Sequence, residues 1–374
     1  MVCSGGPAIA MLRVGLGCAW LASGCTTGFG PRAVRSERPD YNQQIVQSAD
    51  HEMLLNLVRL RYNDSLFFLE LGTVVAQYNY NVSLNASGNV SGSGAGDATV
   101  GTGLGYSETP TLTYTPLRGE EFATRLLAPL PLGSLMFFSQ NGWSAERLLL
   151  VAVQRVNDLQ NAPTASGPTP EGKPDYEAFA DFAARVHRLQ LAGLLGFNWE
   201  EEEQDTDPPG RNPRFWVRAP SDPRSPLAED VAAVRRYLGL APGRSDFKLT
   251  AFPFGRQPTE VGVRSRSLLG MLYFLSASVE VPPADVQAGL VTVTGDAGAP
   301  FDWSQVTRKV MTVHSQQERP ERAFIAVRHR GWWFYIADDD QMSKATFALL
   351  KLVFALQSAS GKDAAPVLTL PVGE

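Results

Sequence analysis

One long stretch of the chain alternates between apolar and polar residues and carries no charge. No charged residue occurs between Glu70 and Asp97. From Val74 to Val90 every second residue is apolar or small, and from Tyr78 onward each residue in between is Asn or Ser. A period of two places one kind of side chain on each face of a β-strand. The stretch therefore predicts a long amphipathic strand.

A second arm with the same character follows this strand. Val100, Leu104 and Tyr106 share one parity, and the glycine- and serine-rich segment SGSGAGDAT before them is suited to a turn. The two arms predict a long protruding β-hairpin over residues 74–116. Its first arm, at about 3.3 Å per residue, would reach roughly 56 Å.

The cysteines lie only at the N-terminus, as Cys3, Cys18 and Cys25. The segment MLRVGLGCAWLASGC has the parts of a secretory signal, namely a positive start at Arg13, a short apolar run and small residues before a cleavage site. The apolar run is too short for a membrane span. Met11 is an alternative to Met1 as the start of the chain.

The stretch LASGC resembles the lipobox of bacterial lipoproteins, with Ala22 where leucine is usual. The resemblance implies cleavage before Cys25, attachment of acyl chains to its thiol, and residues 1–25 as the signal peptide. Thr26 resembles the residue type that directs such proteins to the outer membrane, with the body in the periplasm. The rest of the chain has no cysteine, which excludes a disulfide or a thiolate ligand from the body.

The apolar side of the predicted hairpin needs a cover, because a free two-stranded ribbon is marginal in water. Three alternatives could bury this apolar face. The hairpin folds back on its own domain, pairs with neighbours in a homo-oligomer or with an envelope protein, or enters the outer membrane in a multi-subunit barrel. One chain has too few such strands to close a barrel. The residues expected to make the contacts are Tyr78, Tyr80, Val82, Leu84, Val90, Leu104 and Tyr106.

The remaining sequence predicts an α+β fold, because helical and strand patterns do not alternate regularly. We expect a flexible tether over 26–40, an α+β region over 41–200 that includes the hairpin, and a second over 213–374; the two form either separate domains or one. LMFFSQ and GLVTVTG read as strands, RHRGWW as a tight hairpin turn, and the apolar segment 342–357 as a central core helix. Apolar residues have helical spacing from Ile45 to Arg61, and a helix with Ser144 as its N-cap is expected over 144–160. Further helices are expected over 176–195 and in the segments LAEDVAAVRRYLGL and SRSLLGMLYFLSAS.

Three segments, LLNLVRLRYND, TLTYTPLRGEEF and VLTLPVG, resemble parts of a group of uncharacterised proteobacterial envelope lipoproteins. The resemblance implies a location in the cell envelope and no particular activity.

The sequence contains no strong motif for catalysis, metal binding or nucleotide binding. His51, His187, His314 and His329 do not have metalloprotease spacing, and we expect structural roles for them. The run Asp338–Asp340 precedes a helical pattern and predicts helix capping rather than a metal site. The glycine-rich segment lacks the context of a phosphate-binding loop. The net charge of −5 without a basic patch argues against a nucleic-acid partner. No cofactor is expected.

These observations favour a non-catalytic role in envelope assembly, secretion or scaffolding. The alternative is a periplasmic hydrolase or carbohydrate-binding enzyme that uses carboxylates.

The lipobox resemblance makes a direct prediction. Replacing Cys25 with alanine should abolish labelling by a palmitate analogue and release the protein from the membrane fraction, because the thiol that carries the acyl chains is gone. A Cys18→Ala variant is the matched control and should keep both properties. Unchanged labelling of the Cys25 variant would overturn the lipoprotein hypothesis.

Overall fold

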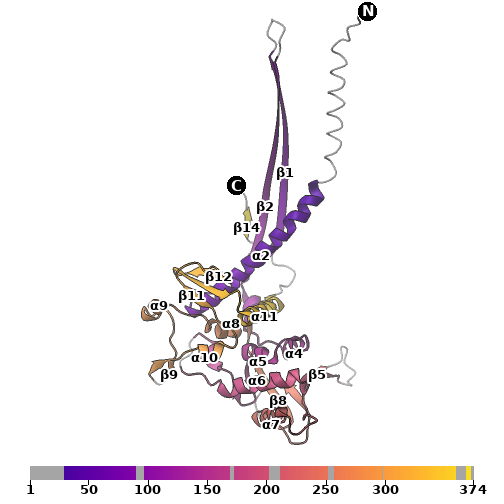
Figure 1. Cartoon of the computed structure of the whole chain (residues 1–374), viewed down its shortest axis with the longest axis vertical. Coiled ribbons are helices and arrows are strands. Elements are labelled where there is room, and N and C mark those ends of the chain that lie inside the picture. The colour runs from indigo at the N-terminus through magenta and orange to yellow at the C-terminus, as the bar shows by residue number, and fades with distance from the viewer. Residues whose placement is uncertain are drawn as a thin grey trace, which may run out of the picture. The chain divides into compact units, whose positions relative to one another are not determined.

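The structure, a computed structural model, describes residues 29–89, 97–168, 172–201, 211–251, 257–296, 298–358 and 368–371. The chain divides into two compact units, residues 1–51 and 52–374. The fold is α+β, with helices and several small sheets in the described ranges (Figure 1). None of the described helices has both the length and the apolar character needed to cross a membrane.

Helix α2 spans Phe29–Arg61. The sequence predicted a flexible tether over 26–40, and the structure corrects this from Phe29 onward, where the backbone is helical. The helical spacing seen after residue 45 is confirmed by burial, because Leu54, Leu57 and Val58 are fully buried in the core of the second unit.

The alternating stretch forms strand β1 (Leu69–Asn89), which pairs antiparallel with β2 (Asp97–Pro116). The register runs from Leu69 opposite Pro116 to Asn89 opposite Asp97, with one irregularity between Leu71 and Thr73. Near the C-terminus, β14 (Leu368–Pro371) adds a third strand by pairing with residues 111–114 of β2.

Three helices follow the hairpin, α3 (Glu120–Leu127), α4 (Leu132–Gln140) and α5 (Ala145–Ala152). The strand predicted for LMFFSQ is wrong, because these residues lie in α4. This helix buries Met136 and leaves Phe137 exposed, so a run that is apolar throughout has only one buried side. The predicted cap of α5 is confirmed, since Ser144 Oγ accepts a hydrogen bond from the Arg147 backbone N–H.

The largest sheet has six strands in the order β4-β3-β8-β7-β6-β5. All neighbouring pairs are antiparallel except β7 and β8, which are parallel. The two regions expected at 41–200 and 213–374 each contribute three strands to this one sheet. The strands are β3 (Val153–Val156), β4 (Leu159–Gln160), β5 (Leu195–Glu201), β6 (Arg211–Val217), β7 (Asp246–Thr250) and β8 (Glu260–Ser265).

Helices α6, α7 and α8 belong to the same part of the chain and match the helical patterns of the sequence. Their bounds are Glu177–Leu191, Pro226–Leu238 and Leu268–Ser276, and a 3-10 turn, η1, covers Pro163–Ser166. Helix α8 is almost entirely buried, which explains why it is apolar on every side.

A second sheet has the order β11-β13-β12. The turn predicted in RHRGWW is confirmed, because Arg330 and Gly331 both have positive φ, 48° and 89°, as a tight two-residue hairpin requires. The strand predicted for GLVTVTG is wrong; the segment is irregular up to β9, which begins at Gly295. The strands are β11 (His314–Gln316), β12 (Ala323–His329) and β13 (Trp332–Ala337).

Short elements α9 (Pro283–Gln287), β9 (Gly295–Asp296), β10 (Ala299–Pro300) and α10 (Ser304–Thr307) connect α8 to the second sheet. Helix α11 (Gln341–Ser358) follows this sheet. It was predicted to be a central core helix, and the structure corrects this in part: Phe347 and Leu350 are fully buried, but Leu352 and Leu356 are 46% and 60% exposed.

A buried arginine joins several of these elements. Arg266, between β8 and α8, is 1% exposed. Its Nη1 donates hydrogen bonds to the carbonyl oxygens of Leu150, Val151 and Val153, at 2.9, 3.1 and 2.9 Å. Its Nη2 donates to the Asn161 carbonyl, and its Nε to Ser166 Oγ. Burial lowers its pKa to about 9, so the guanidinium stays charged at neutral pH.

The acceptors of Arg266 lie where α5 ends and β3 begins. The last carbonyls of a helix have no partner within the helix. The Asn161 side chain donates to the carbonyls of Leu149, Leu150 and Val153, and the Arg266 backbone N–H donates to that of Ala152. Helix α5 therefore ends inside the protein with its final carbonyls satisfied, and a positive charge stands at the negative end of its dipole.

Replacing Arg266 with methionine should lower the free energy of unfolding by about 3 kcal/mol or more, because several buried carbonyls lose their donor. The matched control is Arg264→Met, which changes an exposed side chain two residues earlier; it should stay within about 0.5 kcal/mol of the parent protein. Chemical denaturation measures both. Equal stabilities of the two variants would contradict this role for Arg266.

Candidate functional site

The base of the hairpin is held by two side chains of α2. Asn56 is fully buried, and its amide makes two hydrogen bonds with the backbone of Phe67: Nδ2 donates to the carbonyl at 2.7 Å, and Oδ1 accepts from the N–H at 3.1 Å. Glu52 Oε1 accepts from the Leu69 N–H at 2.9 Å. Burial raises the pKa of Glu52, opposed by this hydrogen bond. Neither residue was predicted from the sequence, where the lone Asn in LLNLV was the available signal.

The register places the residues predicted for hairpin contacts at paired positions. Tyr80 lies opposite Tyr106, and Val82 opposite Leu104. Tyr78 and Leu84, also predicted, lie opposite Glu108 and Thr102. Two predicted sites, the lipidation site Cys25 and the contact residue Val90, lie outside the described residues.

The end of α2 contacts an irregular segment that precedes β9. Arg61 Nη1 donates to the Thr292 carbonyl at 3.0 Å, and Asn63 Nδ2 donates to Thr292 Oγ1, also at 3.0 Å. Asn63 has a φ of 57°, a left-handed conformation that Asn tolerates better than most residues. Two side chains from one turn thus hold a single residue 229 or more positions away.

The two other residues of this turn hold further segments. Tyr62 is buried, and its hydroxyl donates to Asp285 Oδ2 in α9 at 2.6 Å; burial and this bond raise the pKa of Tyr62. Asp64 lies 3.1 Å from His329 Nε2 and 3.1 Å from Arg330 Nη2, at the β12–β13 turn. Burial lowers the pKa of His329. The turn 61–64 is thus a junction of three segments distant in the sequence.

A cavity of about 260 Å³ adjoins this junction, and Arg61 lines it. Arg61 Nε is buried and has no hydrogen-bond partner within the described ranges, and burial lowers the pKa of the guanidinium. Among the described residues, no carboxylate forms an ion pair with Arg61. The wall also includes Val286, Phe301 and Trp303, and the carboxylates of Glu280 and Asp302.

The carboxylate of Glu280 is paired with a histidine. His314 Nδ1 lies 3.1 Å from both of its oxygens. The hydrogen bond with His314 lowers the pKa of Glu280, and the same bond raises the pKa of His314. The pair therefore behaves as an ion pair under mildly acidic conditions.

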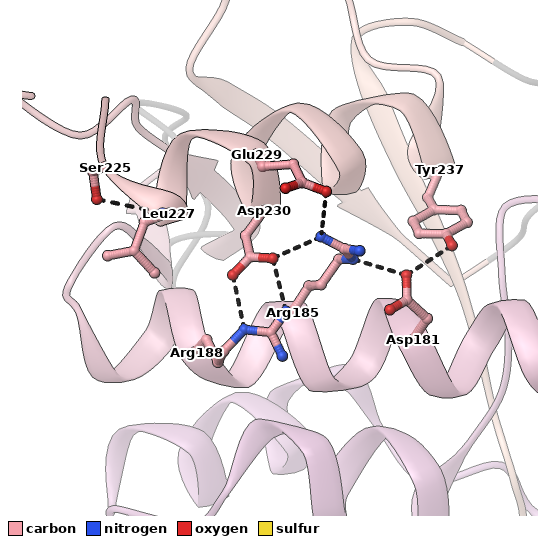
Figure 2. Close-up of polar contacts among 8 residues, drawn as sticks. All are labelled: Asp181, Arg185, Arg188, Ser225, Leu227, Glu229, Asp230 and Tyr237. Carbon is pink, nitrogen blue, oxygen red and sulfur yellow. Dashed lines mark hydrogen bonds and ion pairs between the residues drawn. The ribbon is translucent and has the colours of Figure 1, made fainter. Parts of the chain in front are cut away.

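A second cluster of charges joins α6 to α7 (Figure 2). Arg185 and Arg188 of α6 both donate at 2.7 Å to Asp230 Oδ1 of α7, and Arg185 also donates to Asp181 at 2.8 Å. The Tyr237 hydroxyl of α7 also donates to Asp181, at Oδ2. The arginine hydrogen bonds lower the pKa values of Asp181 and Asp230, so both carboxylates stay ionised and neither is poised to donate a proton near neutral pH.

The acidic run before α11 acts as a cap, as predicted. Asp340 Oδ1 accepts from the Ser343 backbone N–H at 3.0 Å, and Asp338 Oδ1 accepts from Lys344 Nζ at 2.8 Å. Over the ranges that the structure describes, His, Cys, Asp and Glu side chains do not gather in groups of three or more that could hold a metal ion.

The four histidines differ in their neighbours. His187 Nδ1 lies 3.1 Å from Gln190 Oε1 within α6, and His51 is exposed on α2. His314 and His329 pair with Glu280 and Asp64, as described above.

Comparisons of the chain with models of known protein families, with curated proteins and with solved structures found no match.

The Glu280–His314 pair predicts a pH-dependent contribution to stability. A raised histidine pKa contributes stability that is full below the ordinary value of 6.5 and is lost as the pH rises through the folded-state value. A lowered glutamate pKa contributes stability that is full above 4.5 and is lost as the pH falls. The difference in free energy of unfolding between the parent and a His314→Gln variant should therefore be largest between pH 4.5 and 6.5.

Chemical denaturation at pH 5.5 and 8.5 measures this difference. In a Glu280→Gln background, the effect of His314→Gln should no longer depend on pH in this way, because the partner charge is gone. A loss that is equal at both pH values in the parent background would contradict the ion pair.

Proposed function

We propose that the protein is an outer-membrane lipoprotein, anchored through acyl chains on Cys25, whose periplasmic body presents a β-hairpin for strand pairing in a non-catalytic assembly or scaffolding role. The observation that carries this proposal is the β1–β2 ladder, which has twenty paired positions and whose edges are mostly unpaired within the described ranges of the chain.

The edges of this ladder support pairing with another strand. In the described part of the chain, β14 pairs only with residues 111–114 of β2, and no strand joins the outer edge of β1. Unpaired edges expose backbone N–H and C=O groups, and proteins usually block them with Lys or Pro. Residues 71–89 and 98–107 contain no charged residue and no proline. These edges are therefore suited to strand addition.

The composition of the hairpin favours a second copy as the partner. Directly paired residues share one face of an antiparallel ladder, so Tyr80, Val82, Leu104 and Tyr106 are expected to form one apolar patch. Asn and Ser at the intervening positions of β1 carry no charge, so identical β1 strands do not repel each other over residues 71–89. Burying the patch against an identical patch would supply the cover that a two-stranded ribbon lacks.

The contacts at the base of the hairpin also support this role. Asn56 and Glu52 tie the residues that enter β1 to a helix with a buried face. The hairpin is therefore joined to the body by specific hydrogen bonds as well as by the chain, and a force that a partner exerts on the hairpin would be transmitted to α2.

The enzyme alternative depends on carboxylates that are free to react, and the clustered carboxylates described above have structural partners. Asp181 and Asp230 pair with arginines, and Asp340 caps a helix. This supports the non-catalytic proposal.

The test removes the distal hairpin along its register. Ser83 lies opposite Gly103, so deleting residues 84–102 and inserting Asn-Gly between these two residues leaves a two-residue turn. The body should keep its thermal stability, because the removed residues lie beyond the base contacts. Crosslinking in intact envelopes should lose the dimeric and larger species that the parent forms.

A milder variant keeps the hairpin. Asn81→Lys together with Asn85→Lys adds charge to β1 and should weaken self-association, while Asn81→Gln with Asn85→Gln, the matched neutral control, should not. A parent protein that is monomeric in mild detergent and forms no crosslinks in envelopes would contradict the proposal. Crosslinks only to a different protein would replace the second copy by an envelope partner. A deletion that unfolds the body would make the hairpin part of its core.

A further inference from the structure

We propose that the cavity beside Arg61 is a binding site for a small carboxylate with an apolar body. The cavity lies in the second unit, between the end of α2, the chain after α8 and the segment that leads into α10. The proposal does not depend on the hairpin or on the lipid anchor.

The charged residues of the cavity wall are Arg61, Glu280 and Asp302. Arg61 is the cavity's arginine, and it has no carboxylate partner among the described residues; its one hydrogen bond is to the neutral Thr292 carbonyl. Its Nε has no hydrogen-bond partner in the part of the chain that the structure describes. A buried guanidinium without a counter-charge is costly, and an anion in the adjoining cavity would remove that cost.

The two acidic residues of the wall are already engaged. Glu280 is paired with His314, as described above. Asp302 accepts hydrogen bonds from the Ser304 backbone N–H at 2.9 Å and from Ser304 Oγ at 2.8 Å, in the first turn of α10. Asp302 thus has two neutral hydrogen-bond donors, whereas the buried Nε of Arg61 has no hydrogen-bond partner among the described residues. This unsatisfied cationic donor is the group of the wall that would recognise an anion.

The size and the apolar part of the wall define the rest of the ligand. The volume of about 260 Å³ far exceeds the ~10–15 Å³ that one water requires, and it approaches the ~300 Å³ of the smallest typical ligand pockets. Val279, Val281, Val286, Phe301 and Trp303 supply aliphatic and aromatic surface. These features fit an anion of about ten non-hydrogen atoms with a hydrocarbon or aromatic body.

The wall is held in place before any ligand arrives. Trp303 Nε1 donates to Thr294 Oγ1 at 2.9 Å, which orients the indole. Tyr62 holds α9, which carries Val286, through its bond to Asp285. Arg61 itself is restrained by Thr292. Preorganised groups lower the entropic cost of binding. A planar carboxylate matches the forked donors of a guanidinium better than a spherical anion does.

The test uses phenylacetate as the ligand probe, because it combines a carboxylate with an aromatic ring at about the required size. Ligand-observed NMR titration of the full chain in mild detergent should show saturable binding. Phenylacetamide, a neutral analogue of the same shape, should bind roughly tenfold more weakly, because it lacks the charge that pairs with Arg61. Inorganic phosphate should not compete at equal concentration, because it lacks the apolar body, and competition by phosphate would contradict the proposed ligand class.

Variants locate the binding. Arg61→Gln should weaken phenylacetate binding roughly tenfold or more, whereas Arg322→Gln, at an exposed arginine outside the cavity, should leave it unchanged. Val293→Trp changes a 44% exposed residue of the wall, so it should fold and yet block the cavity. This variant decides the matter if Arg61→Gln is unstable. Absence of saturable binding, equal binding of the amide, or undiminished binding by Val293→Trp would overturn the proposal.

Discussion

Helix α5 ends in the interior of the protein, and its final carbonyl groups need donors there. Arg266 and Asn161 supply them, and the position of both residues depends on elements far along the chain, since Arg266 follows β8 by one residue. This contact fixes where α5 becomes β3, and β3 in turn pairs with β8 in the six-stranded sheet. The guanidinium also lies 4.1 Å from the ring centre of Phe274 in α8. A single buried side chain thus links helix α5, the six-stranded sheet and the almost entirely buried helix α8.

The part of helix α2 that belongs to the second unit, Glu52–Arg61, has a comparable role. Asn56 and Glu52 direct the chain into β1, and one turn later Arg61 to Asp64 hold the segments around the cavity. Both proposals therefore concern residues attached to the last three turns of one helix. Its buried face, with Leu54, Leu57 and Val58, keeps those polar residues at fixed positions. The buried apolar side of this helix thus positions polar side chains whose hydrogen-bond partners lie in other segments of the chain.

The parts of the fold that could be predicted from the sequence are those specified by local patterns. The amphipathic period of α6 and α7, the N-cap Ser144 and the Arg-Gly turn between β12 and β13 each need only a few neighbouring residues. The strands predicted for LMFFSQ and GLVTVTG failed because short apolar runs fit a buried helix or an irregular buried segment equally well. The pattern of α5 appeared to continue to residue 160, because nothing local indicates that Arg266 and Asn161 end it at Ala152.

The candidate cavity illustrates why sites of this kind resist prediction from sequence. The acidic run Asp338–Asp340 is conspicuous in the sequence, yet its charges are used locally, in the cap of α11 and in a contact with Lys344. Arg61 is inconspicuous, because arginine at the end of an amphipathic helix is ordinary and suits the helix dipole. Its distinction arises only when folding brings it beside a residue 231 positions away and leaves it without a carboxylate among the described residues. Function at such a site depends on which charges remain unmatched after folding, and that balance is a property of the tertiary structure.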